Sequence, residues 1–64
     1  MFGQRVRELR LNRKISQGAL ALQANLHRNF VGQVERGERN ISLKNIVALA
    51  KALGVKPAKL FAKF

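Results

Sequence analysis

Cysteine, tryptophan and tyrosine are absent from this chain of 64 residues, and only three side chains are acidic. Without cysteine there are no disulfides and no thiolate metal sites, and the composition fits a reducing compartment. One histidine and three carboxylates leave few pairings of nucleophile and acid–base group, so we expect no enzymatic activity, no catalytic residue, no metal and no cofactor. No apolar run approaches the roughly 20 residues of a membrane span, so we expect no membrane partner.

Positive charge dominates what the chain does contain. Thirteen lysines and arginines against three acidic residues give a formal net charge of +10. An excess this large on a folded domain favours a polyanionic partner, and nucleic acid is the leading candidate. The length predicts a single domain, residues 1–64, near the lower limit for a self-sufficient core. Dimerisation is a common remedy for such a small core.

Apolar residues recur at helical spacing throughout, with no alternating strand pattern, which predicts an all-α fold. The five predicted helices begin near residue 2, after Ser16, at 27 or 28, after Ser42 and at Pro57. Asn25, Gly37 and Gly54 are expected at helix ends, because Asn and Gly adopt left-handed backbone most readily. In the fourth helix we expect these residues to face inward: Leu43, Ile46, Val47, Leu49, Ala50 and Leu53.

Residues 16–36 read as two short helices joined by a tight turn. The second of these helices carries Arg28, Asn29 and Gln33 on one face, with Val31 and Val34 on the other. A helix that is apolar behind and polar in front suits insertion into a DNA groove. Arginine, asparagine and glutamine side chains make paired hydrogen bonds to base edges there.

Together these segments resemble the Cro/C1-type helix-turn-helix family of phage repressors and bacterial regulators. The likeness covers nearly the whole chain, through RVRELR, ISQ, LALQANLHRNFVGQVERGERNISL, NIVALAKALGV and KLF. The block VGQVERGERNISLKNI is especially similar to the controller proteins of restriction–modification systems. The resemblance implies a compact five-helix, lambda-repressor-like domain with its helix-turn-helix at about 16–36.

The implied function is sequence-specific regulation of transcription, by a homodimer bound to a palindromic operator in double-stranded DNA. The implied setting is the cytoplasm of a bacterium, on the nucleoid, for a bacterial or phage protein. RNA polymerase is a further candidate partner, and the choice between repressor and activator stays open. Two other functions also stay open: a basic protein that binds DNA or RNA without sequence preference, and an antitoxin-like module that binds DNA and protein.

The resemblance also implies roles for individual residues. The residues expected to read bases are Arg28, Asn29 and Gln33, with His27 beside them. Arginine is suited to guanine, and Asn29 or Gln33 to adenine. The residues expected to contact phosphate are Gln17, at a helix N-terminus, and Arg36, Arg39, Asn40 and Lys44, around the far end of the reading helix. Arg39 is also within reach of a groove edge.

Two further sets of residues have structural roles in this interpretation. Family members commonly pair an arginine of the first helix with the glutamate of the ERG segment, which are Arg10 and Glu35 here. We expect this ion pair to tie the reading helix to the scaffold. Phe61 and Phe64 exceed what a lone short helix can bury, so we expect them at the dimer interface, while Leu60 closes the monomer core.

Overall fold

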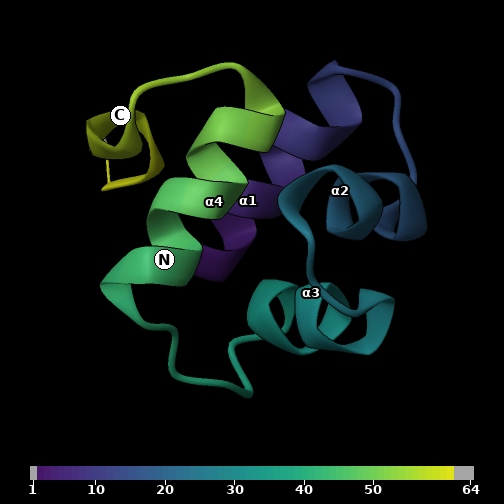
Figure 1. Cartoon of the computed structure of the whole chain (residues 1–64), viewed down its shortest axis with the longest axis vertical. Coiled ribbons are helices and arrows are strands. Elements are labelled where there is room, and N and C mark those ends of the chain that lie inside the picture. Colours follow the sequence, from purple (N-terminus) through teal and green to yellow (C-terminus); the bar gives the residue numbers. More distant parts are fainter. Residues whose placement is uncertain (1, 62–64) are drawn as a thin grey trace.

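The computed structural model describes residues 2–61, which form four α-helices and a closing 3₁₀ helix. The α-helices are α1 (Phe2–Asn12), α2 (Gln17–Ala24), α3 (Arg28–Glu35) and α4 (Leu43–Leu53), and the 3₁₀ helix η1 spans Pro57–Phe61. In Figure 1, α2 stacks on α3, which lies at the outer edge of the molecule. Within residues 2–61 there is no strand, so the all-α prediction is confirmed, and no helix has the length and apolar character to cross a membrane.

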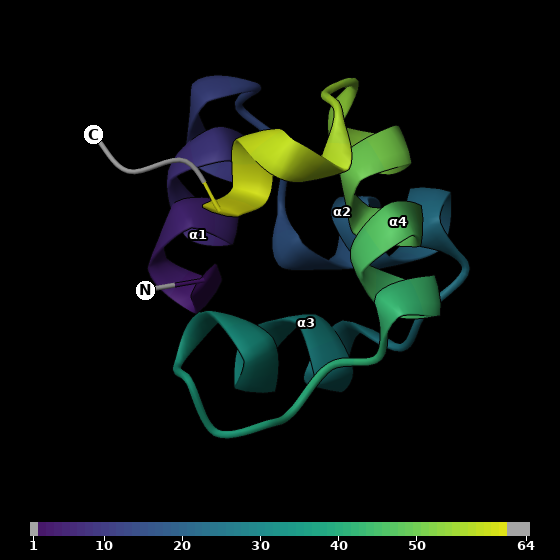
Figure 2. The same cartoon turned by 90° about the vertical axis from the view of Figure 1, so that its left-hand side faces the viewer.

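The arrangement leaves one long side of α3 uncovered by other helices. Figure 2 shows α1 and α4 on either side of the core, with η1 across one end and α3 across the other. The segment between α3 and α4 passes along the edge of the molecule next to α3. The second helix of the helix-turn-helix is therefore held from behind and open in front.

Local capping signals set the helix boundaries, as the sequence predicted. The Ser16 hydroxyl accepts a backbone N–H from the first turn of α2 at 2.9 Å, and the Ser42 hydroxyl does the same for α4 at 3.3 Å. Asn25 (φ 59°), Gly37 (φ 74°) and Gly54 (φ 72°) adopt left-handed backbone at the turns after α2, α3 and α4. These turns reverse the chain direction without strain at the glycines.

The fifth element is a 3₁₀ helix rather than the expected α-helix. It has five residues, and the Lys59 N–H donates to the Lys56 carbonyl oxygen at 2.9 Å, which is the i to i+3 pattern. Segments this short commonly close with 3₁₀ bonds, because an α-helical turn needs more residues to gain its hydrogen bonds. Leu60 is only 1% exposed and closes the core, as predicted.

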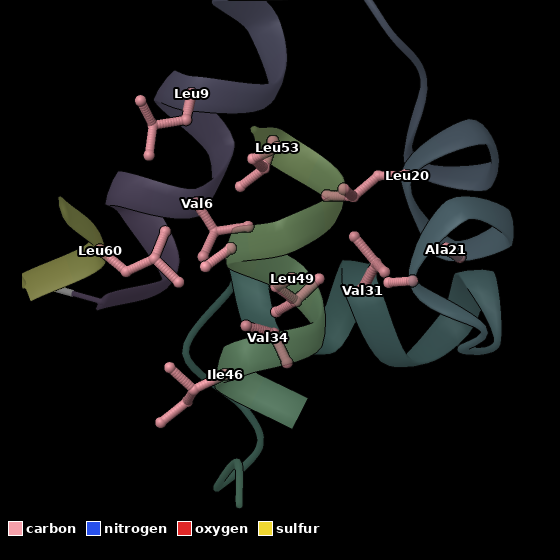
Figure 3. Packing of buried hydrophobic residues seen from close by; sticks show 12 residues of the cluster. Val6, Leu9, Leu20, Ala21, Val31, Val34, Ile46, Leu49, Leu53 and Leu60 are labelled. Atoms are coloured by element: carbon pink, nitrogen blue, oxygen red, sulfur yellow. The ribbon is translucent and has the colours of Figure 1, made fainter. Parts of the chain in front are cut away.

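All five elements contribute side chains to one hydrophobic core (Figure 3). The buried apolar residues are Val6, Leu9, Leu20, Ala21, Ala24, Val31, Val34, Ile46, Leu49, Ala50, Leu53 and Leu60. The inward placement of Leu43 and Val47 was wrong, since they are 74% and 45% exposed. Each residue advances about 100° around a helix, so positions 43 and 47 lie to one side of the stripe that faces the core.

A close backbone approach at Gly3 sets the spacing between α1 and α3. Gly3 is buried, and a Cβ atom there would overlap the carbonyl oxygen of Val34 and lie 3.0 Å from that of Glu35. The obstacle is backbone, which cannot rotate away as a flexible side chain can. The first turn of α1 therefore touches the last turn of α3 only because residue 3 lacks a side chain.

We expect Gly3→Ala to destabilise the fold by about 1–3 kcal/mol, because α1 and α3 must separate to admit the methyl group. Thermal or urea unfolding measures the effect. Gly18→Ala is the matched control: its new Cβ would meet only the Ser16 Oγ at 3.8 Å. That change should be neutral or stabilise by up to about 1 kcal/mol through helix propensity. Equal effects of the two substitutions would contradict the proposed clash.

Candidate nucleic-acid interface

α3 begins with a cap made by histidine. The His27 Nδ1 accepts the backbone N–H of Asn29 at 3.1 Å, and His27 has extended backbone (φ −81°, ψ 142°). The sequence predicted an exposed His27 at the start of this helix, but histidine was expected to cap poorly because Ser, Thr, Asn and Asp are the usual residues there. The side chain that starts α3 is thus also exposed beside it.

The two faces of α3 differ sharply in burial. Val31 and Val34 are 0% and 2% exposed and anchor the helix in the core. Arg28 and Asn29 are exposed, and Gln33 is half-buried. The residues that the sequence assigned to base reading therefore lie on the open side of α3, where a ligand can approach.

Asn29 and Gln33 form a ridge between two open hollows. The first, of about 260 Å³, is lined by Gln17, Arg28, Asn29, Gly32, Gln33 and Arg36. The second, of about 520 Å³, is lined by Asn25, Leu26, His27, Asn29, Phe30, Gln33, Arg39 and Asn45. A polar ridge with a depression on each side is a shape that suits the major groove, whose bases lie between two raised phosphate backbones.

A buried ion pair fixes the end of α3 to the scaffold. The Arg10 Nε donates to the Glu35 Oε2 at 2.6 Å, and its Nη2 donates to the Oε1 at 3.1 Å. The two side chains are 9% and 2% exposed, so the pair expected from the resemblance is present and almost dry. Gln17 joins it by donating from Nε2 to the same Oε1 at 3.0 Å, which turns its amino group inward.

Gly32 leaves the space into which Gln17 fits. A Cβ on Gly32 would lie 3.3 Å from the Gln17 Oε1 and 3.2 Å from an Arg36 guanidinium nitrogen. A larger residue would push both side chains outward into the first hollow. Sequence reasoning gave Gly32 no role, because its importance depends on a contact between two helices.

The predicted phosphate-binding residues do not all gather in one place. Gln17 and Arg36 line the first hollow and Arg39 lines the second. Asn40 instead lines an apolar hollow that includes Phe2 and Phe61, and Lys44 is exposed on the first turn of α4 without lining either hollow beside α3. Of the five predicted phosphate-binding residues, only Gln17, Arg36 and Arg39 thus line the hollows beside α3.

Arg36 is already paired in the free protein. Its Nε lies 3.0 Å from the Glu38 Oε2, and both side chains are more than half exposed. The hydrogen bond to Glu38, with its negative charge as a second cause, raises the pKa of Arg36 above an already high value. Arg36 is therefore a permanent cation at this surface.

Asn45 is a polar residue of this surface that sequence reasoning missed. It is half-buried on the first turn of α4 and lines the second hollow together with Asn29 and Gln33. Its position three residues after the cap Ser42 was a usable signal. That position points a side chain back toward the loop before the helix.

Only one of the two predicted interface aromatics lies among the described residues. Phe61 is 57% exposed, and its ring centroid is 5.2 Å from that of Phe2. Phe64 lies outside the described residues. Phe30 is half-buried and packs against the core.

Comparison with known proteins identifies the family. The model of the helix-turn-helix family matches residues 6–60. The chain belongs to this helix-turn-helix family. Control protein C.BamHI from Bacillus amyloliquefaciens is 49% identical over 61 residues, which cover 94% of this chain and 75% of that relative.

Two solved structures connect the helix-turn-helix fold to this chain. The restriction-modification controller protein C.AhdI from Aeromonas hydrophila matches with a TM-score of 0.93 and 55% identity, over 94% of this chain and 91% of that one. The P22 c2 repressor, solved in complex with a synthetic operator, matches with a TM-score of 0.87 and 35% identity, over 94% and 91% of the two chains. The fold is lambda-repressor-like, and this helix-turn-helix protein of the Cro/C1 type is a sequence-specific DNA-binding regulator of transcription, not an enzyme.

We expect Arg10→Ala to destabilise this helix-turn-helix protein by about 3–5 kcal/mol, because it leaves the buried Glu35 carboxylate without its cation. Urea unfolding measures the loss. The matched control removes both charges together, as Arg10→Met with Glu35→Leu, and should lose much less. If the single and double variants lost equal stability, the buried charge would not be the cause.

Proposed function

We propose that this regulator binds a palindromic operator as a homodimer and lays α3 in the major groove of each half-site. One observation carries the proposal: the ridge of Asn29 and Gln33, beside Arg28, is the open face of a helix whose other face is buried. The fold shared with the P22 c2 repressor, which was solved with an operator, supports the same docking.

Each side chain of the ridge suits a different base edge. Arg28 matches the O6 and N7 acceptors of guanine, and Asn29 matches the N6 donor and N7 acceptor of adenine. Gln33 lies one turn further along α3, and His27 lies at its start. Four side chains on two helical turns cover only a few base pairs, so specificity depends on two copies acting together.

The phosphate contacts come from both sides of the ridge. Gln17 stands at the first position of α2, where free backbone N–H groups favour an anion. The other contributors are Arg36, Arg39, Asn40 and Lys44, all exposed. These contacts hold α3 in register but do not read sequence.

The dimer interface is the apolar surface near η1. Phe61 and Val47 are 57% and 45% exposed, and an apolar hollow of about 430 Å³ includes Phe2, Ile41, Ile46 and Phe61. A second copy seated there would cover these side chains and add to a small core. Half-sites about 34 Å apart would then present the same groove face to both copies of α3.

The mechanism of regulation is occupancy of a promoter. A bound dimer either blocks RNA polymerase or contacts it as an activator. The likeness to Control protein C.BamHI and to the restriction-modification controller C.AhdI makes control of a restriction–modification system the leading biological role. The site of action would be the bacterial nucleoid, in the cytoplasm, because the DNA target is there.

We expect Arg28→Ala to weaken binding to the selected operator by about 1–3 kcal/mol while leaving affinity for random DNA nearly unchanged. Lys44→Ala should weaken binding to both DNAs equally and reduce the salt slope by about 1. For roughly eight neutralised phosphates, the slope of log affinity against log salt should be near −7 in the parent protein. Selection from a random duplex pool, followed by fluorescence anisotropy, supplies these measurements.

The same experiment separates the alternatives. A protein without sequence preference would enrich no motif and would be stripped from any duplex by excess random DNA. An antitoxin-like module would keep its operator but would also retain a protein partner. If Arg28→Ala and Lys44→Ala each lost operator affinity and random-DNA affinity to the same extent, Arg28 would not read a base.

We expect Phe61→Ser to shift the protein from dimer toward monomer, because it removes an exposed ring from the apolar surface near η1. Sedimentation equilibrium measures the shift. Leu22→Ser is the matched control, since Leu22 is 82% exposed on α2 and does not line the apolar hollow. An unchanged association constant for Phe61→Ser, or an equal loss for Leu22→Ser, would contradict this interface.

A further inference from the structure

Arg39 contacts two side chains of α3 at once. Its Nη1 donates to the Gln33 Oε1 at 3.1 Å, and its guanidinium carbon lies 5.1 Å from the centroid of the Phe30 ring. Phe30 packs against the core, so the ring is a fixed support. The guanidinium is thereby held over α3 beside the second hollow.

The hydrogen bond from Arg39 decides which end of the Gln33 amide is available. A free glutamine offers both an acceptor oxygen and a donor amino group, which together match adenine. Here the oxygen already accepts from Arg39, so the amino group is directed away from Arg39. Arg39 occupies one of the two lone pairs of the oxygen and fixes the plane of the amide, so the amino group is the end that stays fully available. Its natural target in the major groove is the pair of acceptors on guanine, N7 and O6.

We propose that Arg39 is a positioning residue that makes Gln33 select guanine over adenine at one base pair of each half-site. The inference rests on the proposed function, because it requires α3 to read bases. It changes the role given to Gln33 by sequence reasoning, which matched it to adenine, and adds a second role to Arg39. Phe30 contributes by holding the guanidinium in place.

The geometry requires arginine and not simply a positive charge. A planar guanidinium can lie over an aromatic ring and donate from its edge at the same time. A lysine ammonium keeps the charge and can still contact phosphate, but it has no plane to stack and no fixed direction of donation. Arg39→Lys therefore separates positioning of Gln33 from attraction to the DNA backbone.

The experiment is selection from a random duplex pool with four proteins: the parent, Arg39→Lys, Gln33→Ala and the double variant. Affinities for guanine, adenine and random duplexes follow by anisotropy. The base pair read by Gln33 is the one whose preference disappears in Gln33→Ala. The parent should prefer guanine there about tenfold. Arg39→Lys should reduce this preference to about twofold or turn it toward adenine. Any loss of phosphate contact in this variant should lower the affinities for guanine, adenine and random duplexes equally.

Two controls limit the interpretation. The double variant should behave as Gln33→Ala alone, because Arg39 acts through Gln33. Arg7→Lys makes the same substitution at an exposed arginine of α1 to which no DNA contact is assigned, so the preference at this base pair should not change. Thermal unfolding of each variant checks that the fold is intact.

Several results would overturn the inference. A parent preference for adenine at the Gln33 base pair would do so, as would a guanine preference that survives in Arg39→Lys. If the losses of operator affinity from Arg39→Lys and Gln33→Ala multiplied in the double variant, Arg39 would read a base independently of Gln33. A changed preference at a different base pair would mean the same. If the parent enriched no motif at all, the proposed function would fail and this inference with it. If the parent enriched a motif but gave any of the contradicting results above, only the role of Arg39 would be wrong and the proposed function would stand.

Discussion

The Glu35 carboxylate is the point on which the rest of the structure depends, because it joins three helices. It receives Arg10 from α1 and Gln17 from α2, and it belongs to the last turn of α3. Just beside it, the backbone of α3 meets α1 at Gly3. The direction of α3 is thus set by a buried ion pair and by a close backbone contact, both at the C-terminal end of α3. Since the polar ridge points wherever α3 points, the proposed reading of bases depends on this contact.

How far the sequence determined the result differs from residue to residue. Helix ends at Ser16, Asn25 and Gly54 were predictable, because a cap acts on its own neighbours in the chain. The error at Leu43 and Val47 has the opposite origin: both are apolar and helical, but the neighbouring elements decide which stripe is covered. The cap from His27 is local, but histidine is not among the residues that usually form such caps. The close approach at Gly3 and the Arg39–Gln33 contact depend on tertiary arrangement, and no periodicity reveals them.

The net charge of +10 overstates what faces DNA. Arg5 of α1 and Arg13, just after its end, donate to the carbonyl oxygens of Lys59 and Leu53, at 3.2 and 3.0 Å, and so tie this part of the chain to the last two elements. Arg10 forms a buried ion pair with Glu35 and is not available to phosphate. Composition alone could not separate these structural cations from those free to meet phosphate. The family resemblance, and not the charge, therefore carried the residue-level predictions.

The cap at the start of α3 has a chemical consequence for His27. A neutral imidazole carries its single hydrogen on one ring nitrogen, and Nδ1 is occupied as an acceptor here. The hydrogen must then reside on Nε2 of this exposed ring. Folding thus selects the tautomer, and the Nε2 of His27 can act toward an approaching molecule only as a hydrogen-bond donor. Methylation of Nε2 would keep the cap at the start of α3 but would remove the N–H group, so His27 could no longer donate a hydrogen bond to a duplex.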